Sequence, residues 1–257
     1  MIEQLIEELA ALPQIEAIAL GGSRASGRYD EGSDYDIYLY CTEPVPEALR
    51  RNILKSHCSY MEIGNAFWEY EDNGTLNNGV DFDLLYRDLD GFCEGIAQVV
   101  ERCQAHNGYT TCMWHNLLTC KILYDRDGRL TEAKQRFSVP YPQQLKANIL
   151  DRNWKLLRSA MPAYELQIKK AVQRKDYVSI NHRVSAFLES YFDILFALNG
   201  QTHPGEKRLV SICVDTCSLL PDKFQENLHT LFGHMFIQPD LIPDDLDSIL
   251  TELTKIM

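Results

Sequence analysis

Basic residues are scarce in this sequence of 257 residues. It holds 25 Lys and Arg against 37 Asp and Glu, which gives a net charge of −12. Non-specific nucleic-acid binding draws its affinity from many Lys and Arg contacts to phosphate, so the deficit argues against a nucleic-acid partner. The deficit is uneven: residues 1–100 hold 19 acidic and 6 basic residues, whereas residues 146–183 hold 9 basic and 3 acidic ones. This asymmetry predicts two domains that face each other across a charged ligand.

Long apolar runs and export signals are also missing. No apolar segment approaches membrane-spanning length, and Glu3, Glu7 and Glu8 stand where a secretion signal carries Lys or Arg. We therefore expect a cytoplasmic protein with no membrane partner.

Cysteine and histidine motifs for metal or redox chemistry are absent as well. The 8 cysteines include no CxxC pair, and the 7 histidines include no HExxH spacing. These absences argue against zinc-knuckle, thioredoxin-like and zinc-protease interpretations. We expect reduced, mostly buried thiols, and the 45% hydrophobic content is typical of a folded globular protein.

Strand patterns are confined to the first half of the chain. Strands are predicted over 15–20, 33–40, 61–72 and 79–88, with the turn-rich NGTLNNG at 73–79 joining the last two. Helices are predicted near 46–57, 90–104 and 110–121, and LYDRDGRL at 123–130 reads as a turn at a domain junction.

From about residue 140 onward, apolar residues recur with the helical period. The predicted helices cover 142–160, 163–175, 177–198, 206–219 and 222–236, and an amphipathic helix follows near the C-terminus. The fold class predicted from these patterns is α+β, with a catalytic domain over 1–130 and an all-α helical domain over 131–257.

The predicted strand SDYDIYLY at 33–40 places two carboxylates on one face. Asp34 and Asp36 alternate with Tyr35 and Ile37, so the aspartates share a face and the opposite face is expected to pack against helices. Their Cα atoms are expected roughly 6.5–7 Å apart. A carboxylate in a strand is costly unless it is paired or bound to a cation, and Mg²⁺ prefers such oxygen ligands. The pair therefore predicts a divalent-metal site.

A glycine-rich turn, LGGSRASG at 20–27, precedes this strand. Glycines let the backbone turn tightly and approach a ligand, while N–H groups, hydroxyls and guanidinium groups hold phosphate oxygens. The candidate phosphate ligands are Gly21, Gly22, Ser23, Arg24, Arg28 and Ser33.

Gly22-Ser23, ten intervening residues and then Asp34-Tyr35-Asp36-Ile37 resemble the signature of the DNA polymerase β-like nucleotidyltransferase superfamily. The layout is similar to the two-domain antibiotic nucleotidyltransferases, which act on aminoglycosides and lincosamides. The resemblance implies a small mixed β-sheet flanked by helices, followed by a helical bundle. It also implies three carboxylates that bind two Mg²⁺ ions beside a nucleoside triphosphate.

The third carboxylate of that signature lies on a later strand, which VDFDLLY at 80–86 supplies. Asp83 has the usual form, an aspartate before two aliphatic residues, and Asp81 lies on the same predicted strand face. The resemblance favours Asp83 as metal ligand, and Asp81 remains the alternative.

The activity implied is transfer of a nucleoside monophosphate, foremost AMP from ATP, to a hydroxyl of a small molecule or protein, with release of pyrophosphate. One Mg²⁺ would orient the triphosphate and the other would activate the hydroxyl. The alternative is a non-enzymatic nucleotide-binding module that acts on a partner protein, as in toxin–antitoxin pairs. Nucleotide addition to RNA is disfavoured by the acidic charge, and the acceptor and the oligomeric state are left open.

The helical half contributes further candidates. NGQTHPGEKRLV at 199–210 is similar to a segment in the helical domains of relatives, which implies that Lys207, with Arg208, reaches the triphosphate. The alternative is an exposed loop lysine. Glu189 or Asp193 is either a general base or part of a solvated stripe, and KKAVQRK at 169–175 is either a solvated helix face or the lining of a phosphate-rich cleft.

Overall fold

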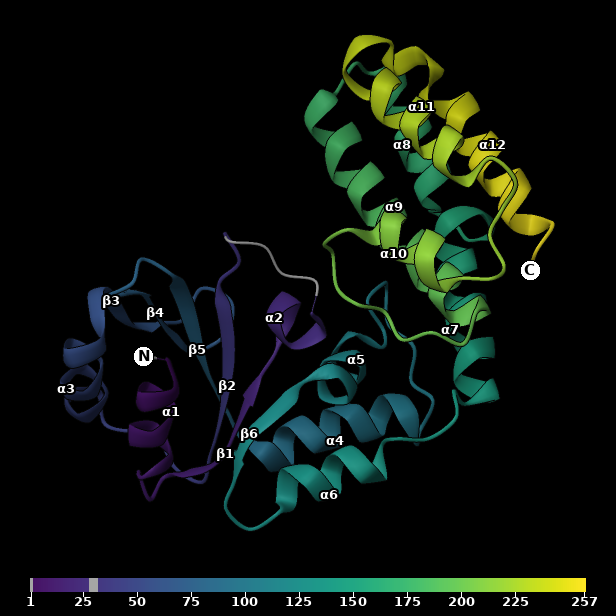
Figure 1. Ribbon diagram of the computed structural model, residues 1–257. Helices are drawn as coiled ribbons and strands as arrows, with labels where there is room; N and C mark the ends of the chain where they lie inside the picture. The colour runs from purple at the N-terminus through teal and green to yellow at the C-terminus, as the bar shows by residue number, and fades with distance from the viewer. Residues whose placement is uncertain (1, 28–31) are drawn as a thin grey trace. The chain divides into compact units, whose positions relative to one another are not determined.

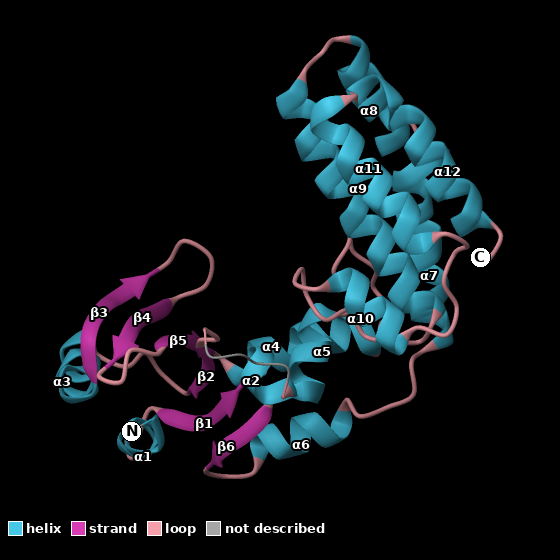
Figure 2. Cartoon of the chain, turned by 45° about the horizontal axis from the view of Figure 1, so that its top comes forward, coloured by secondary structure: helices cyan, strands magenta, loops and turns pink. Residues whose placement is uncertain are grey.

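A computed structural model describes residues 2–27 and 32–257 of the chain. Two compact units make up the fold: Met1–Ala97 with Asn116–Val139, and Gln98–His115 with Pro140–Met257. The strands all belong to the first unit, and the second is helical (Figure 2). The predicted α+β class is thereby confirmed. The domain boundary expected at residue 130 lies inside helix α6 (Arg129–Arg136).

Among the described residues, six strands form one mixed sheet in the order β3-β4-β5-β2-β1-β6. The strands are β1 (Ile15–Leu20), β2 (Tyr35–Cys41), β3 (Cys58–Asn65), β4 (Glu71–Leu76), β5 (Asp81–Arg87) and β6 (Lys121–Asp125). The central pair β2 and β5 is parallel, and the other pairs are antiparallel. The small mixed sheet implied by the resemblance is confirmed.

Helices α1 (Ile2–Ala10) and α3 (Glu47–His57) pack on one face of the sheet (Figure 1). Leu5 and Leu9 of α1 are spaced one helical turn apart and are fully buried in this core. Ile37 and Leu39 of β2 join them, as the alternation of that strand predicted. The carboxylate of Asp36 therefore belongs to the opposite face.

That opposite face is covered in part by helix α4 (Leu89–Val100), whose Phe92 ring lies 5.5 Å from the ring of Tyr40. The guanidinium of Arg87 lies 4.0 Å from the centroid of the Tyr38 ring. The remaining helices of this unit are α2 (Gly22–Ser26), α6 and part of α5 (Cys112–Thr119).

A buried ion pair joins α3 to the sheet. Arg50 and Asp72 are 2% and 0% exposed and are directly hydrogen-bonded. Asp72 also accepts from the backbone N–H of Gly64 at 2.8 Å and from the Tyr86 hydroxyl at 2.8 Å. Burying two charges is tolerated when the pair is hydrogen-bonded in this way, so the network fixes the β3–β4 hairpin to the helix beneath it.

The second unit is built from α7 to α12 around a core of its own. Its helical segments are α7 (Gln143–Trp154), a π-helical turn (Lys155–Ser159), α8 (Tyr164–Gln173), α9 (Tyr177–Leu198), α10 (Leu209–Thr216), α11 (Phe224–Ile237), a 3₁₀ turn (Pro239–Leu241) and α12 (Ile242–Thr254). Asp176 caps α9 by accepting from the backbone N–H of Ser179 at 3.0 Å. Every residue of α9 from Ser190 to Leu198 is buried, so this helix is the centre of the bundle.

Over residues 2–27 and 32–257, the structure contains no helix with both the length and the apolar character needed to span a bilayer.

Three expectations from the sequence were wrong. The segment 61–72 is not one strand but parts of β3 and β4, and residues 73–76 continue β4 instead of forming a turn. Gly74 is needed there because an added Cβ would lie 2.6 Å from the Tyr60 carbonyl oxygen and 2.8 Å from the Phe82 ring. LYDRDGRL contains the end of β6 and the start of α6. Five of the eight cysteines are only half-buried, although all eight are free thiols.

Candidate functional site

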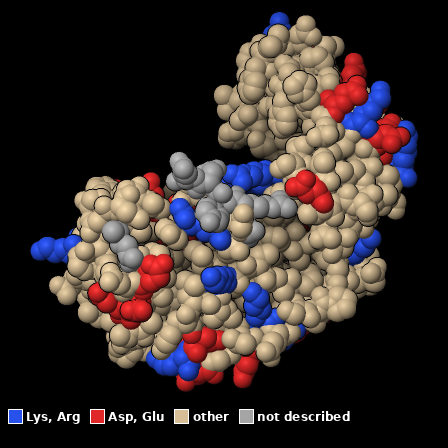
Figure 3. Space-filling model, viewed as in Figure 1, with Lys and Arg blue, Asp and Glu red and all other residues tan. Residues whose placement is uncertain are grey.

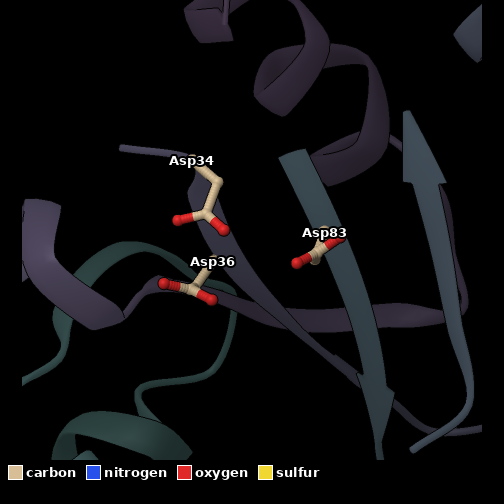
Figure 4. Close-up of side chains that lie close together, drawn as sticks. All are labelled: Asp34, Asp36 and Asp83. Carbon is tan, nitrogen blue, oxygen red and sulfur yellow. The ribbon is translucent and has the colours of Figure 1, made fainter. Parts of the chain in front are cut away.

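Three aspartates come together on the sheet face opposite α1 and α3. Asp34, Asp36 and Asp83 each offer a carboxylate oxygen, and these oxygens all lie within 4.8 Å of one another. The three side chains are half-buried and point toward a common space (Figure 4). Among the described residues, they are the group whose geometry could hold a metal ion.

The strand arrangement explains this convergence. Asp34 immediately precedes β2 and Asp36 lies on it, so the two side chains leave the chain on the same side. Strand β5 runs parallel to β2, and the register pairs Asp36 with Asp83 directly. A neighbouring strand is about 4.8 Å away, so carboxylates at paired positions necessarily meet.

The glycine turn packs directly against the side chains of this strand. An added Cβ on Gly21 would lie 2.2 Å from the Tyr38 ring, and one on Gly22 would lie 1.7 Å from Oδ2 of Asp36. Gly22 also has a φ of +61°, which disfavours other residues. The backbone N–H of Gly21 donates to the Asp36 carbonyl oxygen at 2.8 Å. The glycines are therefore required for contact with the carboxylate strand, a role the sequence did not reveal.

Arg24 connects the turn to the start of β2. Its Nε donates to the backbone carbonyl oxygens of Ser33 at 3.0 Å and Asp34 at 2.9 Å, and a terminal nitrogen donates to Ser33 at 2.6 Å. The guanidinium also lies 4.1 Å from the centroid of the Tyr35 ring. Arg24 thus holds the backbone that carries Asp34. Ser23 and Ser33 are half-buried beside it, and Arg28 lies outside the described residues.

Asp83 has a supporting partner that the sequence did not identify. Asn73 of β4 lies opposite Asp83 in the register and donates to its Oδ1 at 2.7 Å. Asn65 of β3 donates in turn to the Asn73 amide oxygen at 2.5 Å. By contrast, Asp81 is exposed and accepts from the Thr75 hydroxyl at 2.7 Å. The structure therefore brings Asp83 to the other two carboxylates and leaves Asp81 apart.

The donor set fits a hard divalent cation. Three carboxylates in contact repel one another, and Mg²⁺ binds through carboxylates, water and substrate phosphates. The fit rests on the ligand type and on the convergence of the three carboxylates within 4.8 Å.

Lys207 and Arg208 lie in an exposed loop of the second unit, before α10. The loop is anchored by His203, which is 0% exposed and whose backbone N–H donates to the Thr111 hydroxyl at 2.7 Å. Burial lowers the pKa of His203 to about 3, so the ring is neutral. The Thr202 hydroxyl is hydrogen-bonded to Nδ1 of His115 at 2.7 Å. Phosphate binding by Lys207 stays a prediction.

The two candidate bases of α9 differ in environment. Asp193 is 1% exposed and accepts from the Thr110 N–H at 3.0 Å, the Thr110 hydroxyl at 2.6 Å and the Asn153 amide at 3.0 Å. Burial raises its pKa to about 6. These bonds assign Asp193 a structural role, tying α9 to α7 and to the 105–111 segment. Glu189 is half-buried, and burial raises its pKa as well.

Charged side chains on the face shown in Figure 3 form small separate groups of either sign, divided by uncharged surface. Broad nucleic-acid binding uses a continuous basic stripe, which this face does not present.

Comparisons with known proteins agree with this geometry. Residues 2–106 match the family model described as a nucleotidyltransferase domain, and residues 109–209 match a domain of unknown function, DUF4037. Residues 2–106 are therefore a nucleotidyltransferase domain, as the Gly-Ser and Asp-Tyr-Asp motifs indicated.

Two solved structures are similar to the whole chain. One is a nucleotidyltransferase-like protein from Exiguobacterium sibiricum 255-15, with 12% identity and a TM-score of 0.46, covering 100% of this chain and 74% of that one. The other is an aminoglycoside 6-adenyltransferase from Bacillus subtilis, with 12% identity and a TM-score of 0.30, covering 99% of this chain and 90% of that one. No curated protein matches the sequence. Likenesses this distant assign no substrate.

Proposed function

We propose that the protein is a Mg²⁺-dependent enzyme of the cytoplasm that transfers AMP from ATP to a hydroxyl of a small-molecule or protein acceptor, releasing pyrophosphate. The observation that carries the proposal is the convergence of Asp34, Asp36 and Asp83 within 4.8 Å in a nucleotidyltransferase domain. Two Mg²⁺ ions bound there would neutralise the carboxylates and the triphosphate and would lower the pKa of the acceptor hydroxyl.

The reaction is an in-line displacement. The acceptor oxygen forms a new bond to the α-phosphorus, and the bond from that phosphorus to the oxygen bridging the β-phosphorus breaks. Pyrophosphate leaves with the electron pair. The proton of the acceptor hydroxyl passes to a carboxylate oxygen of Asp83 and from there to solvent.

The glycine turn supplies the phosphate contacts in this proposal. The backbone N–H of Gly22 and the hydroxyls of Ser23 and Ser33 bind phosphate oxygens, and Gly21, whose N–H donates to the Asp36 carbonyl oxygen, lets the turn approach the nucleotide closely beside the metal-binding carboxylates. Arg24 contributes positive charge to the same contacts while it holds the start of β2. Lys207, an exposed cation in the second unit, is proposed as a further triphosphate ligand.

The test is transfer of label from α-³²P-ATP with Mg²⁺ to a panel of hydroxylated small molecules and proteins. We expect labelling of an acceptor by the wild-type protein, loss of labelling in Asp36→Asn and Asp83→Asn, and retention in Asp81→Asn. Asp81 is the matched control because it lies on the same strand and face but is bonded to Thr75. Nucleotide binding by calorimetry with no transfer to any acceptor would identify a binding module instead of an enzyme. Equal labelling by wild type and Asp36→Asn would exclude the proposed site.

A further inference from the structure

The helical unit contains a hollow between α8 and α9, and none of its lining residues belongs to the group of three aspartates. It is an open hollow with a volume of about 100 Å³, and all of its lining comes from residues 167–183. The lining residues with polar groups are Gln167, Lys170, Arg174, Asp176, Ser179 and Arg183. Three cations and one carboxylate therefore surround a space on a protein whose net charge is −12.

The segment 146–183 holds nine cations, and three of them line this hollow. Four of its nine cations are engaged elsewhere: Lys146 donates to the Leu198 carbonyl oxygen, Arg152 to Asn107, Lys155 to Asp151, and Arg158 to Glu165 and Asp247.

The other five cations of the segment form no ion pair within residues 2–27 and 32–257. They are Lys169, Lys170, Arg174, Lys175 and Arg183. Lys170, Arg174 and Arg183 line the hollow. Like charges held close together repel one another, so these three cations are stabilised when an anion binds.

The positions of the cations suit a phosphate group. Lys170 lies in the last turn of α8, and Arg174, four residues later, is the C-cap of that helix. Ser179 and Arg183 are four residues apart on α9, so they lie on one side of it. The Arg183 Nε donates to the Ser179 hydroxyl at 3.3 Å, which leaves its terminal nitrogens for a ligand. Guanidinium groups bind phosphate through two parallel hydrogen bonds.

The one carboxylate of the lining is already engaged. Asp176 accepts from the Ser179 N–H as the cap of α9, where its charge interacts favourably with the positive end of that helix. The three cations outnumber this carboxylate, so the lining keeps a net positive charge.

We propose that this α8–α9 hollow is a binding site for a small phosphate-bearing molecule, with Lys170, Arg174 and Arg183 as its cationic ligands. The ligand class is inorganic phosphate, pyrophosphate or the phosphate tail of a nucleotide. A small ligand is favoured over nucleic acid because the cations converge on one hollow, whereas a nucleic-acid backbone requires a row of contacts.

The test is isothermal titration calorimetry with sodium pyrophosphate in EDTA, on the full chain and on the chain with Asp36→Asn. EDTA removes metal ions from the three aspartates, and Asp36→Asn removes one of the proposed metal ligands. Calorimetry does not measure nucleotide transfer, so the result is independent of the proposed activity. We expect pyrophosphate to bind, and Arg174→Ala with Arg183→Ala to weaken binding about tenfold or more through lost charge-assisted hydrogen bonds.

The matched control is Lys155→Ala with Lys255→Ala, which removes the same charge from exposed ion pairs of the same unit. We expect this control to bind as the parent does, with circular dichroism confirming that both double variants are folded. Absence of binding to the parent, or equal weakening in both double variants, would overturn the proposal. So would binding of an RNA oligonucleotide without binding of pyrophosphate or inorganic phosphate.

Discussion

Replacing Gly22 with alanine would place a methyl carbon 1.7 Å from Oδ2 of Asp36 and 2.8 Å from its Cγ. Such contacts lie far inside normal van der Waals distances, so the carboxylate must rotate away from Asp34 and Asp83 or the turn must move. Displacing a group that orients a metal ligand typically costs about 10–100-fold in metal affinity. We therefore expect Gly22→Ala to weaken divalent-ion binding by about that factor.

Gly27 supplies the matched control for backbone strain. It ends the same short helix with a φ of +73°, against +61° for Gly22, and among residues 2–27 and 32–257 no atom beyond its chain neighbours lies within 4 Å of an added Cβ. Alanine in this left-handed region costs about 1–2 kcal/mol at either position. Both variants should lose that much free energy of unfolding, but only Gly22→Ala should lose metal affinity.

The assay is Mn²⁺ titration monitored by electron paramagnetic resonance of the free ion, which requires neither nucleotide nor acceptor. Urea unfolding of the same samples measures the shared strain. If Gly22→Ala and Gly27→Ala bound Mn²⁺ equally well, the argument that the turn positions Asp36 would be refuted.

Three further changes test other parts of the structure. Asn73→Ala removes the hydrogen bond to Asp83 and should weaken Mn²⁺ binding about tenfold, whereas Thr75→Ala on the same strand should leave it unchanged. Asp72→Ala leaves its buried arginine partner without a counter-charge and should cost about 3–5 kcal/mol in chemical unfolding; a loss below 1 kcal/mol would contradict a buried pair. The pKa of Asp193 is raised to about 6 in the folded state, so the folded protein binds a proton at this carboxyl more tightly than the unfolded chain does. Its contribution to the free energy of unfolding, about 3 kcal/mol, is therefore full below about pH 4 and is lost as the pH rises through 6. Asp193→Asn should remove this pH dependence from urea unfolding curves, and an unchanged dependence would show that another group causes it.

Local periodicity predicted the parts of the fold that depend on local pattern. Strand β1 and helix α9 begin and end where the apolar spacing placed them, because each buries a continuous apolar surface. The carboxylate cluster was also accessible from sequence. Strand alternation predicted that Asp34 and Asp36 lie on one face. The motif form favoured Asp83 as the third carboxylate, and in the structure the parallel register pairs Asp83 with Asp36.

The errors arose where the cause lies far away in the chain. Asn73-Gly74 has the sequence of a turn, yet Gly74 is a strand residue because β4 pairs with β3 on one side and β5 on the other. Glycine is required there because the Phe82 ring and the Tyr60 carbonyl occupy the space of a side chain. Strand β6 was missed because its partner β1 lies about a hundred residues earlier in the chain.

The buried polar networks were equally inaccessible from the sequence. Asp72 and Arg50 are 22 residues apart, and Asp193 and Thr110 are 83 residues apart. A carboxylate with such a partner has the same local sequence as a solvated one, so only the tertiary structure distinguishes them.

The most direct test of the central claim is anomalous X-ray diffraction from crystals soaked in Mn²⁺ and a non-hydrolysable ATP analogue. We predict an anomalous peak within coordination distance of carboxylate oxygens from Asp34, Asp36 and Asp83, with the triphosphate against the Gly22 turn. Crystals with the analogue bound and no anomalous peak between these three carboxylates would contradict it.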